Sequence, residues 1–291
     1  MKIGQAEVFR IGEYEGLGFP PQEHLPAWSD EEAGKHLEWL VPGHYAPEHG
    51  RLLGSVHGWL VRVHGTTILI DTCSGHGKER PHTPFFSMLD SPFLENLLAT
   101  GIKPEDVDYV VCTHLHVDHV GWNTHFEAGK WVPTFPNARY LVSRAEFDLL
   151  SKAELEIEDN RRIFEDSIKP LIDADKLLLV DPPSELTGGI WIEPAPGHTP
   201  GHVLLRIADP TGDLIFVGDL MHHPIQVLYP DWSSNACRDP GQAAETRRRL
   251  FADCSGTNAT LFPVHFASPY CCRIGEKVDR GYECIFVAPD E

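Results

Sequence analysis

The chain has 291 residues, and its 43 acidic and 24 basic side chains give a formal net charge of -19 at pH 7. This balance argues against a nucleic-acid partner, because phosphates need a basic surface. No stretch approaches the ~18 consecutive apolar residues of a membrane helix. The first residues lack the apolar run of a signal peptide, so we expect a cytoplasmic protein without membrane contact. Seven cysteines, an odd number, argue against a disulfide framework.

The first distinctive segment, residues 17–54, is rich in proline and aromatic residues, and one capped helix is expected from Ser29-Asp30-Glu31-Glu32. Two interpretations stay open. The segment is either a connection pinned over the core by its aromatic side chains, or a wall or lid over a functional site.

Residues 56–63 and 66–70 are β-branched and apolar, which predicts a hairpin through His64-Gly65. The turn Asp71-Thr72-Cys73-Ser74-Gly75 follows. A helix is expected over residues 93–100, with Pro92 at its first position. Residues 107–112 are typical of a buried strand. A capping box at Ser143-Arg144-Ala145-Glu146 predicts a charged, exposed helical region, with a break, that reaches about residue 174.

The second half begins with strands expected over residues 189–193, 203–208 and 214–217. Asp239 then caps a helix that reaches about Cys254. Strands followed by helices, twice over, suit two similar halves packed sheet to sheet with helices outside. The length is compatible with one domain over residues 1–291 that buries a large core.

The most informative motif is Thr113-His114-Leu115-His116-Val117-Asp118-His119, directly after the buried strand of residues 107–112. Residues two apart leave a strand on the same side of the chain, so the first two imidazoles should lie together. The turn that follows can bring the carboxylate and the third imidazole to a neighbouring point. Imidazole nitrogen and carboxylate oxygen are ligands that zinc accepts, so the motif predicts a metal site.

More residues of the same kind follow turns or apolar segments further along the chain. Pro196-Gly197-His198-Thr199-Pro200-Gly201-His202 is a loop by its glycine and proline content. The strand of residues 214–217 runs through Gly218 into Asp219, and residues 261–264 lead into His265. Strand ends that open on one rim of a sheet are where α/β folds assemble sites.

Together these motifs resemble the metallo-β-lactamase superfamily of dinuclear metal hydrolases. The resemblance extends over nearly the whole chain and implies a four-layer αβ/βα sandwich, an α/β fold. Carried over position by position, it implies a first metal on His114, His116 and His198. It implies a second metal on Asp118, His119 and His265, with Asp219 bridging both.

Two divalent cations about 3.5–4 Å apart can share a bridging water and supply hydroxide at neutral pH. Zinc is the expected metal, and manganese, iron and cobalt stay open. Asp118 could also pass a proton to the leaving group. No G-x-S-x-G motif is present, which argues against an α/β-hydrolase esterase.

In lactone- and ester-cleaving relatives, a Tyr or His soon after the bridging Asp can point at the substrate oxygen. His222 is the candidate for that role, and packing beside the metal site is its other interpretation. We assign no role to His202 or His125. The run from Asp71 to the loop of residues 81–86, together with residues 226–232, resembles the lactonase and organophosphate-hydrolase-like group.

We therefore predict a metal-dependent hydrolase that cleaves a lactone or other small carboxylic ester. The alternatives are an organophosphate or aryl-ester hydrolase, a thioesterase of the glyoxalase II type, and a non-catalytic metal-binding interaction protein. A homodimer is left open. The ligand motifs do not identify the substrate.

Overall fold

The computed structural model describes residues 1–288, and the chain divides into two compact units. Unit 1 consists of Met1, residues 14–55 and the chain from Gly189 onward, and unit 2 consists of residues 2–13 and 56–188. The boundaries fall within strands β2 and β4 and just after β11.

An eight-stranded sheet has the order β1-β2-β4-β5-β6-β9-β10, with β3 paired to β4. Its strands are β1 (Lys2–Ile3), β2 (Ala6–Leu17), β3 (Tyr45–Ala46), β4 (Arg51–Val63), β5 (Thr66–Ile70), β6 (Tyr109–Val111), β9 (Arg139–Ser143) and β10 (Leu177–Val180). The expected hairpin is confirmed as antiparallel β4 and β5. Strands β5, β6 and β9 pair in parallel, so their carboxyl ends meet at one edge of the sheet.

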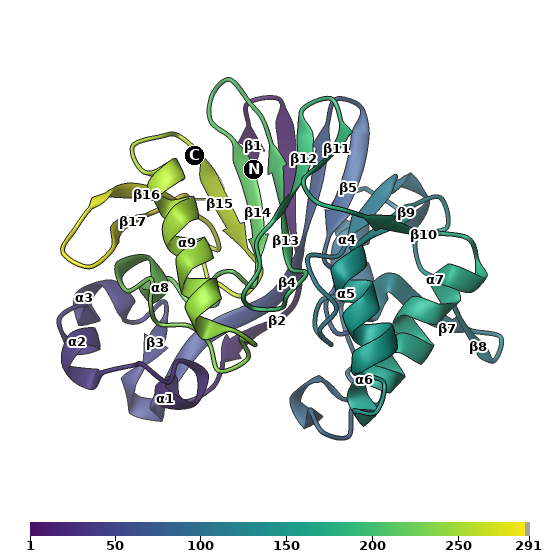
Figure 1. Cartoon of the computed structure of the whole chain (residues 1–291), viewed down its shortest axis with the longest axis horizontal. Helices are drawn as coiled ribbons and strands as arrows, with labels where there is room; N and C mark the ends of the chain where they lie inside the picture. The colour runs from purple at the N-terminus through teal and green to yellow at the C-terminus, as the bar shows by residue number, and fades with distance from the viewer. Residues whose placement is uncertain (289–291) are drawn as a thin grey trace. The chain divides into compact units, whose positions relative to one another are not determined.

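The helices of unit 2 are α4 (Phe93–Ala99), α5 (Arg144–Asp148), α6 (Glu158–Ile163) and α7 (Lys169–Asp173). Figure 1 shows α5 to α7 gathered beside β9 and β10. The predicted cap is confirmed, because Ser143 Oγ accepts from the Glu146 N–H at 3.2 Å. Pro92 precedes α4 instead of being its first residue. A two-stranded sheet of β7 (Thr124–Glu127) and β8 (Lys130–Pro133) completes the unit.

A seven-stranded sheet has the order β11-β12-β13-β14-β15-β16-β17. Its strands are β11 (Ser184–Thr187), β12 (Ile190–Pro194), β13 (Val203–Ile207), β14 (Leu214–Gly218), β15 (Thr260–Pro263), β16 (Cys272–Lys277) and β17 (Tyr282–Phe286). The three strands expected here are confirmed to within a residue or two. Strands β14 and β15 pair in parallel, so the residues that follow them, up to Asp219 and His265, emerge at the same edge.

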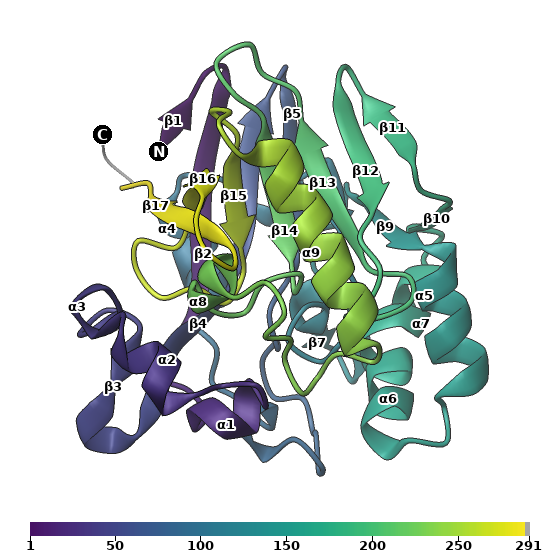
Figure 2. The same ribbon diagram turned by 60° about the vertical axis from the view of Figure 1, so that its left-hand side comes forward.

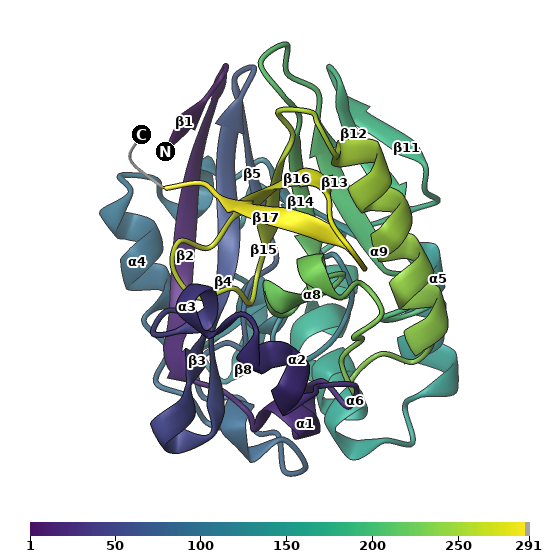
Figure 3. The same cartoon turned by 90° about the vertical axis from the view of Figure 1, so that its left-hand side faces the viewer.

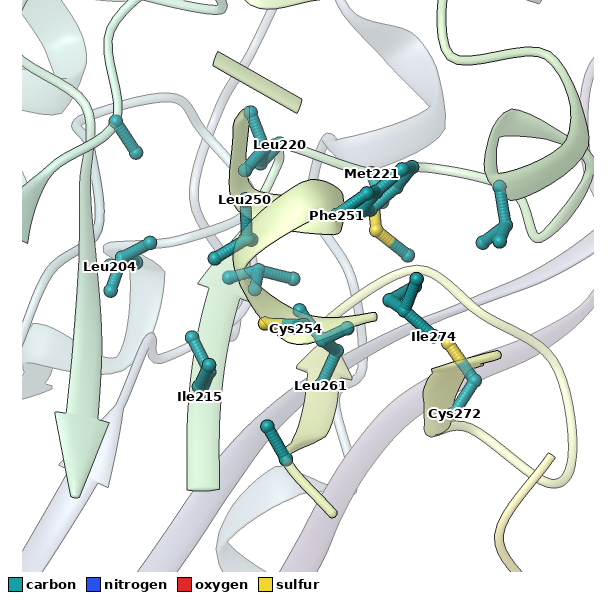
Figure 4. Packing of buried hydrophobic residues seen from close by; sticks show 14 of the residues in the cluster. Leu204, Ile215, Leu220, Met221, Leu250, Phe251, Cys254, Leu261, Cys272 and Ile274 are labelled. Atoms are coloured by element: carbon teal, nitrogen blue, oxygen red, sulfur yellow. The ribbon is translucent and has the colours of Figure 1, made fainter. Parts of the chain in front are cut away.

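Helix α9 (Pro240–Cys254) covers the sheet in unit 1, as Figure 2 shows. Its start is the predicted one, since Asp239 Oδ1 accepts from the Gln242 N–H at 2.9 Å. Leu250, Phe251 and Cys254 pack on the apolar side chains of β13 to β16 (Figure 4). Each fully buried Leu or Phe side chain here stabilises the fold by roughly 1.5–3 kcal/mol.

Residues 17–54, called here the wall segment, contain α1 (Pro21–His24), α2 (Asp30–Gly34) and α3 (Leu37–Leu40). The expected helix is α2, capped by Ser29, and the others escaped prediction because each is a single turn. The wall segment packs within unit 1 on α8 (Ile225–Leu228) and the residues after it. The buried cluster consists of Leu25, Trp28, Ala33, Leu40, Leu52, Ile225, Tyr229 and Trp232. Figure 3 shows α8 near β17 and the wall segment.

Among the described residues 1–288, no helix is both long and apolar enough to cross a membrane.

Candidate metal centre

The carboxyl end of β6 leads directly into the four residues that we call the loop cluster: His114, His116, Asp118 and His119. The ring of His114 lies 4.4 Å from that of His116 and 3.9 Å from that of His119, measured between centroids. Asp118 Oδ1 lies 3.6 Å from His119 Nε2. One short loop therefore brings together three imidazoles and a carboxylate.

Asp71 fixes the orientation of the loop cluster from the neighbouring parallel strand. It follows β5 directly, and its Oδ2 accepts from His119 Nδ1 at 2.9 Å. The same carboxylate accepts from the Thr113 N–H and from Thr113 Oγ1, each at 2.8 Å. This hydrogen bond places the ring proton of His119 on Nδ1, so Nε2 carries the lone pair that can bind a metal. Carboxylates orient metal-binding histidines in this way in many proteins.

The sequence pattern puts Asp71 on a turn and by itself points to no role for this residue. The feature that could have revealed its role is its position at the end of a strand that pairs in parallel with the strand before the histidine motif.

Cys73 is fully buried, and its Sγ faces the carbonyl of Ile11 at 3.9 Å. A Cβ on Gly121 would lie 1.9 Å from the carbonyl carbon of Ser74, so this turn must pack on a glycine beside the loop cluster.

Unit 1 contributes a second group, which we call the Asp219 cluster: His198, Asp219, His222 and His265. Asp219 Oδ2 lies 3.2 Å from Nε2 of both His198 and His222. Asp219 Oδ1 lies 3.0 Å from His265 Nε2. The ring of His222 stacks on that of His265, with 5.5 Å between centroids and 7° between planes. Three imidazoles therefore surround one buried carboxylate.

The other ring nitrogens of this cluster face the protein. His265 Nδ1 donates to the carbonyl of Ser55 at 3.0 Å, and His198 Nδ1 lies 3.6 Å from Cys237 Sγ. His202 Nε2 accepts from the Asp219 N–H at 3.1 Å, which holds the backbone of Asp219 in place. His202 is thus a structural residue of the cluster.

His222 differs from its neighbours in this cluster. It is 6% exposed, and its Nδ1 makes no hydrogen bond with any of the described residues. Burial lowers the pKa of His222, while Asp219 acts in the opposite direction. The ring of His24, from α1, meets it edge-on at 5.2 Å. Burial also lowers the pKa of His24 well below its ordinary value, so burial favours the uncharged form of both rings.

Both clusters fit a divalent metal by the chemistry of their atoms. Buried imidazoles that direct Nδ1 at the protein leave Nε2 as a ligand, and the carboxylates supply the oxygen that zinc and similar ions accept. Asp219 is 4% exposed, and a negative charge in so buried a place needs compensation by positive charge. A bound cation would supply that compensation.

The comparisons with known proteins agree with this chemistry. The family model of the metallo-beta-lactamase superfamily matches residues 51–265, and the chain belongs to that superfamily. The expected α/β fold class, of the metallo-β-lactamase type, is thereby confirmed.

Among individual proteins, the chain is similar to N-acyl homoserine lactonases. It is 30% identical over 165 residues to AttM of Azorhizobium caulinodans, covering 54% of this chain and 55% of that protein. It is 27% identical over 165 residues to AiiA of Bacillus thuringiensis subsp. kurstaki, covering 56% and 58%. The chain thus spans about half the length of these curated relatives.

Solved structures share the fold over almost the entire chain. The hydrolase AbOPH of the beta lactamase superfamily matches with a TM-score of 0.81 at 23% identity, covering 99% of this chain and 96% of that one. AidC, a dizinc quorum-quenching lactonase in complex with a product, matches with a TM-score of 0.74 at 23% identity, covering 98% and 95%.

Proposed function

We propose that this protein is a dinuclear metal-dependent hydrolase that cleaves a lactone or other small carboxylic ester. The observation that carries the proposal is the Asp219 cluster, in which three imidazole nitrogens lie within 3.2 Å of one carboxylate. This arrangement suits a carboxylate that is shared between cations. The histidine-rich loop of unit 2 supplies the remaining ligand types.

The assignment of ligands follows the superfamily pattern. His114, His116, His198 and Asp219 would hold one ion, and Asp118, His119 and His265 would hold the other. By the superfamily pattern, Asp219 would be shared between the two ions. Zinc is the proposed metal, because mixed imidazole and carboxylate sites suit it. The relative AidC, which is described as a dizinc lactonase, also supports this choice.

When bound, two divalent ions supply a hydroxide nucleophile near neutral pH and withdraw electron density from the scissile carbonyl. The chain's own residues then have three tasks. Asp71 keeps His119 in the tautomer and orientation that it needs. Asp118 carries a proton to the oxygen of the leaving group. His222 donates a hydrogen bond to the carbonyl oxygen as negative charge develops on it, since its ring has a nitrogen to offer.

The choice of a lactone rests on the relatives, several of which are N-acyl homoserine lactonases. An aryl-ester or organophosphate substrate is the second candidate, because two divalent cations can polarise a phosphoryl oxygen as well as a carbonyl oxygen. Both candidates need the same nucleophile, so the substrate panel must separate them.

The test combines elemental analysis with a substrate panel. We expect close to two transition-metal ions per chain after mild purification. The panel contains N-acyl homoserine lactones, simple γ-lactones, aryl esters, an aryl phosphotriester and a glutathione thioester, and we expect the lactones to be cleaved fastest.

Two results would contradict the proposal. The first is a preparation without transition metal that stays inactive on every substrate after zinc, manganese or cobalt is added. The second is bound metal without turnover of any substrate, which would support the non-catalytic metal-binding alternative.

A further inference from the structure

The backbone of His222 is held by one buried side chain. His222 lies between β14 and α8, where the chain forms neither helix nor strand, so regular secondary structure supplies no partner for its N–H. That N–H donates to Gln226 Oε1 at 2.7 Å, and the N–H of His223 donates to the same oxygen at 3.0 Å. A single amide oxygen of α8 thus fixes two consecutive backbone groups.

The other end of the Gln226 amide is also engaged. Its Nε2 donates to the carbonyl of Trp232 at 2.7 Å, and the side chain is fully buried. Two N–H groups at one end and a carbonyl at the other determine which end of the amide is the oxygen. Buried hydrogen bonds of this kind are costly to break, because the groups released find no water.

The neighbours of His222 in the chain have anchors of their own. The Leu220 carbonyl accepts from Arg247 Nε, on α9, at 2.8 Å. The ring of His223 donates from Nε2 to the carbonyl of His44, in the wall segment, at 2.9 Å. The amide on α8 is therefore the anchor that acts on the backbone of His222 itself.

The ring of His222 depends on this backbone anchor more than other rings of the metal centre do. His119 and His265 are each oriented by a hydrogen bond at Nδ1. Among residues 1–288, Nδ1 of His222 has no such partner. The ring stacks on His265, with 5.5 Å between centroids, and it points where its backbone and this packing direct it.

We propose that Gln226 is a positioning residue, which holds the backbone of His222 so that its ring meets the carbonyl oxygen of the substrate. This inference rests on the proposed function, in which His222 donates a hydrogen bond to that oxygen. A donor that is oriented before the substrate arrives stabilises the developing charge without a cost of reorganisation. Gln226 acts through His222 and takes no direct part in the reaction.

The two ends of the amide allow this role to be separated from simple support of the fold. Gln226→Glu keeps an oxygen for the two N–H groups and changes the end that faces Trp232. Gln226→Met keeps the length of the side chain and removes the hydrogen bonds at both ends. If the oxygen end carries the function, the first variant should be much more active than the second.

The experiment uses the metal-loaded full chain and the substrate of the panel that is cleaved fastest. The variants are Gln226→Glu, Gln226→Met, His222→Ala and the double variant of Gln226→Met with His222→Ala. The control is Ser233→Ala, which removes a hydrogen bond of 2.8 Å to the Pro240 carbonyl from a nearby stretch of chain. Steady-state kinetics gives kcat and KM, and elemental analysis gives the metal content.

We expect Gln226→Met to lower kcat about tenfold or more, with KM and metal content nearly unchanged, because a displaced donor is missed mainly in the transition state. Gln226→Glu should recover most of the loss, and Ser233→Ala should match the parent. In the His222→Ala background, Gln226→Met should cost less than about twofold, since residues that act through one another are not additive.

A second measurement does not depend on turnover. NMR of the zinc-loaded chain reports the ring Cε1–H resonance of His222, which is assigned by its absence from His222→Ala. We expect Gln226→Met to shift or broaden this resonance, because the backbone that carries the ring loses its anchor. Gln226→Glu and Ser233→Ala should leave it near its position in the parent.

The outcomes separate this inference from the proposed function. If substrates are cleaved and Gln226→Met lowers kcat equally with and without His222, Gln226 is a general support of the fold and the inference is wrong. A Gln226→Met variant that behaves like Ser233→Ala overturns it as well. If the parent cleaves no substrate, the proposed function fails, and an altered His222 resonance in Gln226→Met still supports the anchoring role.

Thermal unfolding checks that each variant is folded. If Gln226→Met does not fold, Gln226→Asn takes its place, because it keeps the buried amide but is one carbon too short for the same contacts. We expect the same loss of kcat and the same dependence on His222 for this variant. Full kcat in Gln226→Asn would contradict the positioning role.

Discussion

Two histidine rings of the candidate metal centre are oriented by a hydrogen bond from Nδ1. His119 gives Nδ1 to the carboxylate of Asp71 and His265 gives Nδ1 to the carbonyl of Ser55. In each case this hydrogen bond at Nδ1 selects the tautomer, and Nε2 is directed at the site. Asp219 is held in the same manner through its backbone, whose N–H donates to His202.

Asp219→Asn tests the shared carboxylate. The substitution keeps the shape but removes the negative charge and places an amide among three imidazoles that lie 3.0–3.2 Å away. We expect activity to fall roughly 10²-fold or more, with reduced metal content. Steady-state kinetics and elemental analysis of the same preparation measure both. Full turnover in the variant would show that Asp219 does not hold two ions together.

His222→Ala tests the proposed oxyanion donor. Loss of one such donor costs about 10²–10³ in kcat, whereas metal content should not change because His222 is not an assigned ligand. The matched control is His125→Ala, on β7 in unit 2, for which we expect kinetics like those of the parent. If His222→Ala matches the parent on every substrate, His222 is a packing residue.

At the scale of whole elements, short segments are positioned by longer ones. The wall segment has only single-turn helices, and it is held by aromatic contacts such as Trp28 with Trp232 at 5.8 Å and His44 with Phe286 at 4.8 Å. Its role as a wall or lid stays a prediction. Helix α9, in contrast, is long and capped, and it anchors the apolar core of unit 1.

Asp239→Ala tests the cap of α9. The substitution removes the acceptor for the Gln242 N–H at 2.9 Å, which should lower the free energy of unfolding by about 1 kcal/mol. Denaturant unfolding of the metal-loaded protein measures the change. Asp253→Ala is the control, since this exposed carboxylate lies in the last turn of α9, where negative charge is unfavourable. Equal destabilisation by both variants would contradict the capping role.

At the scale of the whole molecule, one buried ionic network ties the chain after β5 to the segment between α6 and α7. Lys78 is 1% exposed and donates to Ser167 Oγ at 2.7 Å, to Thr124 Oγ1 at 2.8 Å and to Asp166 Oδ1 at 3.3 Å. Arg80 donates two hydrogen bonds to the same carboxylate, at 2.7 and 2.9 Å. Burial lowers the pKa of Lys78 from 10.5 to about 7, against the opposing influence of Asp166.

Stability should therefore depend on pH through Lys78. Between pH 7 and pH 10.5 the unfolded chain binds a proton at Lys78 that the folded chain does not, so this residue makes the folded state more stable as the pH rises. We expect the difference in unfolding free energy between the parent and Lys78→Met to shift in favour of the parent from pH 7 to pH 9. Lys152→Met, which alters an exposed pair with Asp148, should show no such shift. A difference that is constant with pH would contradict the lowered pKa.

Removal of the metal tests whether the bound ions stabilise the folded chain. A ligand that binds only the folded chain raises its stability by mass action, so chelation should lower the melting temperature. Scanning calorimetry before and after dialysis against a chelator measures the effect, and readdition of zinc should reverse it. An unchanged melting temperature in a protein shown to have lost its metal would contradict a link between these ions and the fold.

The sequence by itself determined the local features. The spacing of His114, His116, Asp118 and His119 after an apolar strand was enough to predict their cluster, because residues within one short loop cannot lie far apart. The hairpin of β4 and β5 and the caps at Ser29, Ser143 and Asp239 were also readable, since each depends on neighbours in the chain. The family motifs implied the fold class.

Only the tertiary structure decided contacts between distant segments. The roles of Asp71 and His202 depend on which strands and loops lie side by side, and no local pattern encodes that choice. His24 stands almost 200 residues before its neighbour His222 and reaches it only because the wall segment packs on α8. The ion pairs of Lys78 and Arg80 were invisible for the same reason, since a charged residue in a sequence is normally read as exposed. Burial, which comes from the packing of remote elements, decides what such residues do.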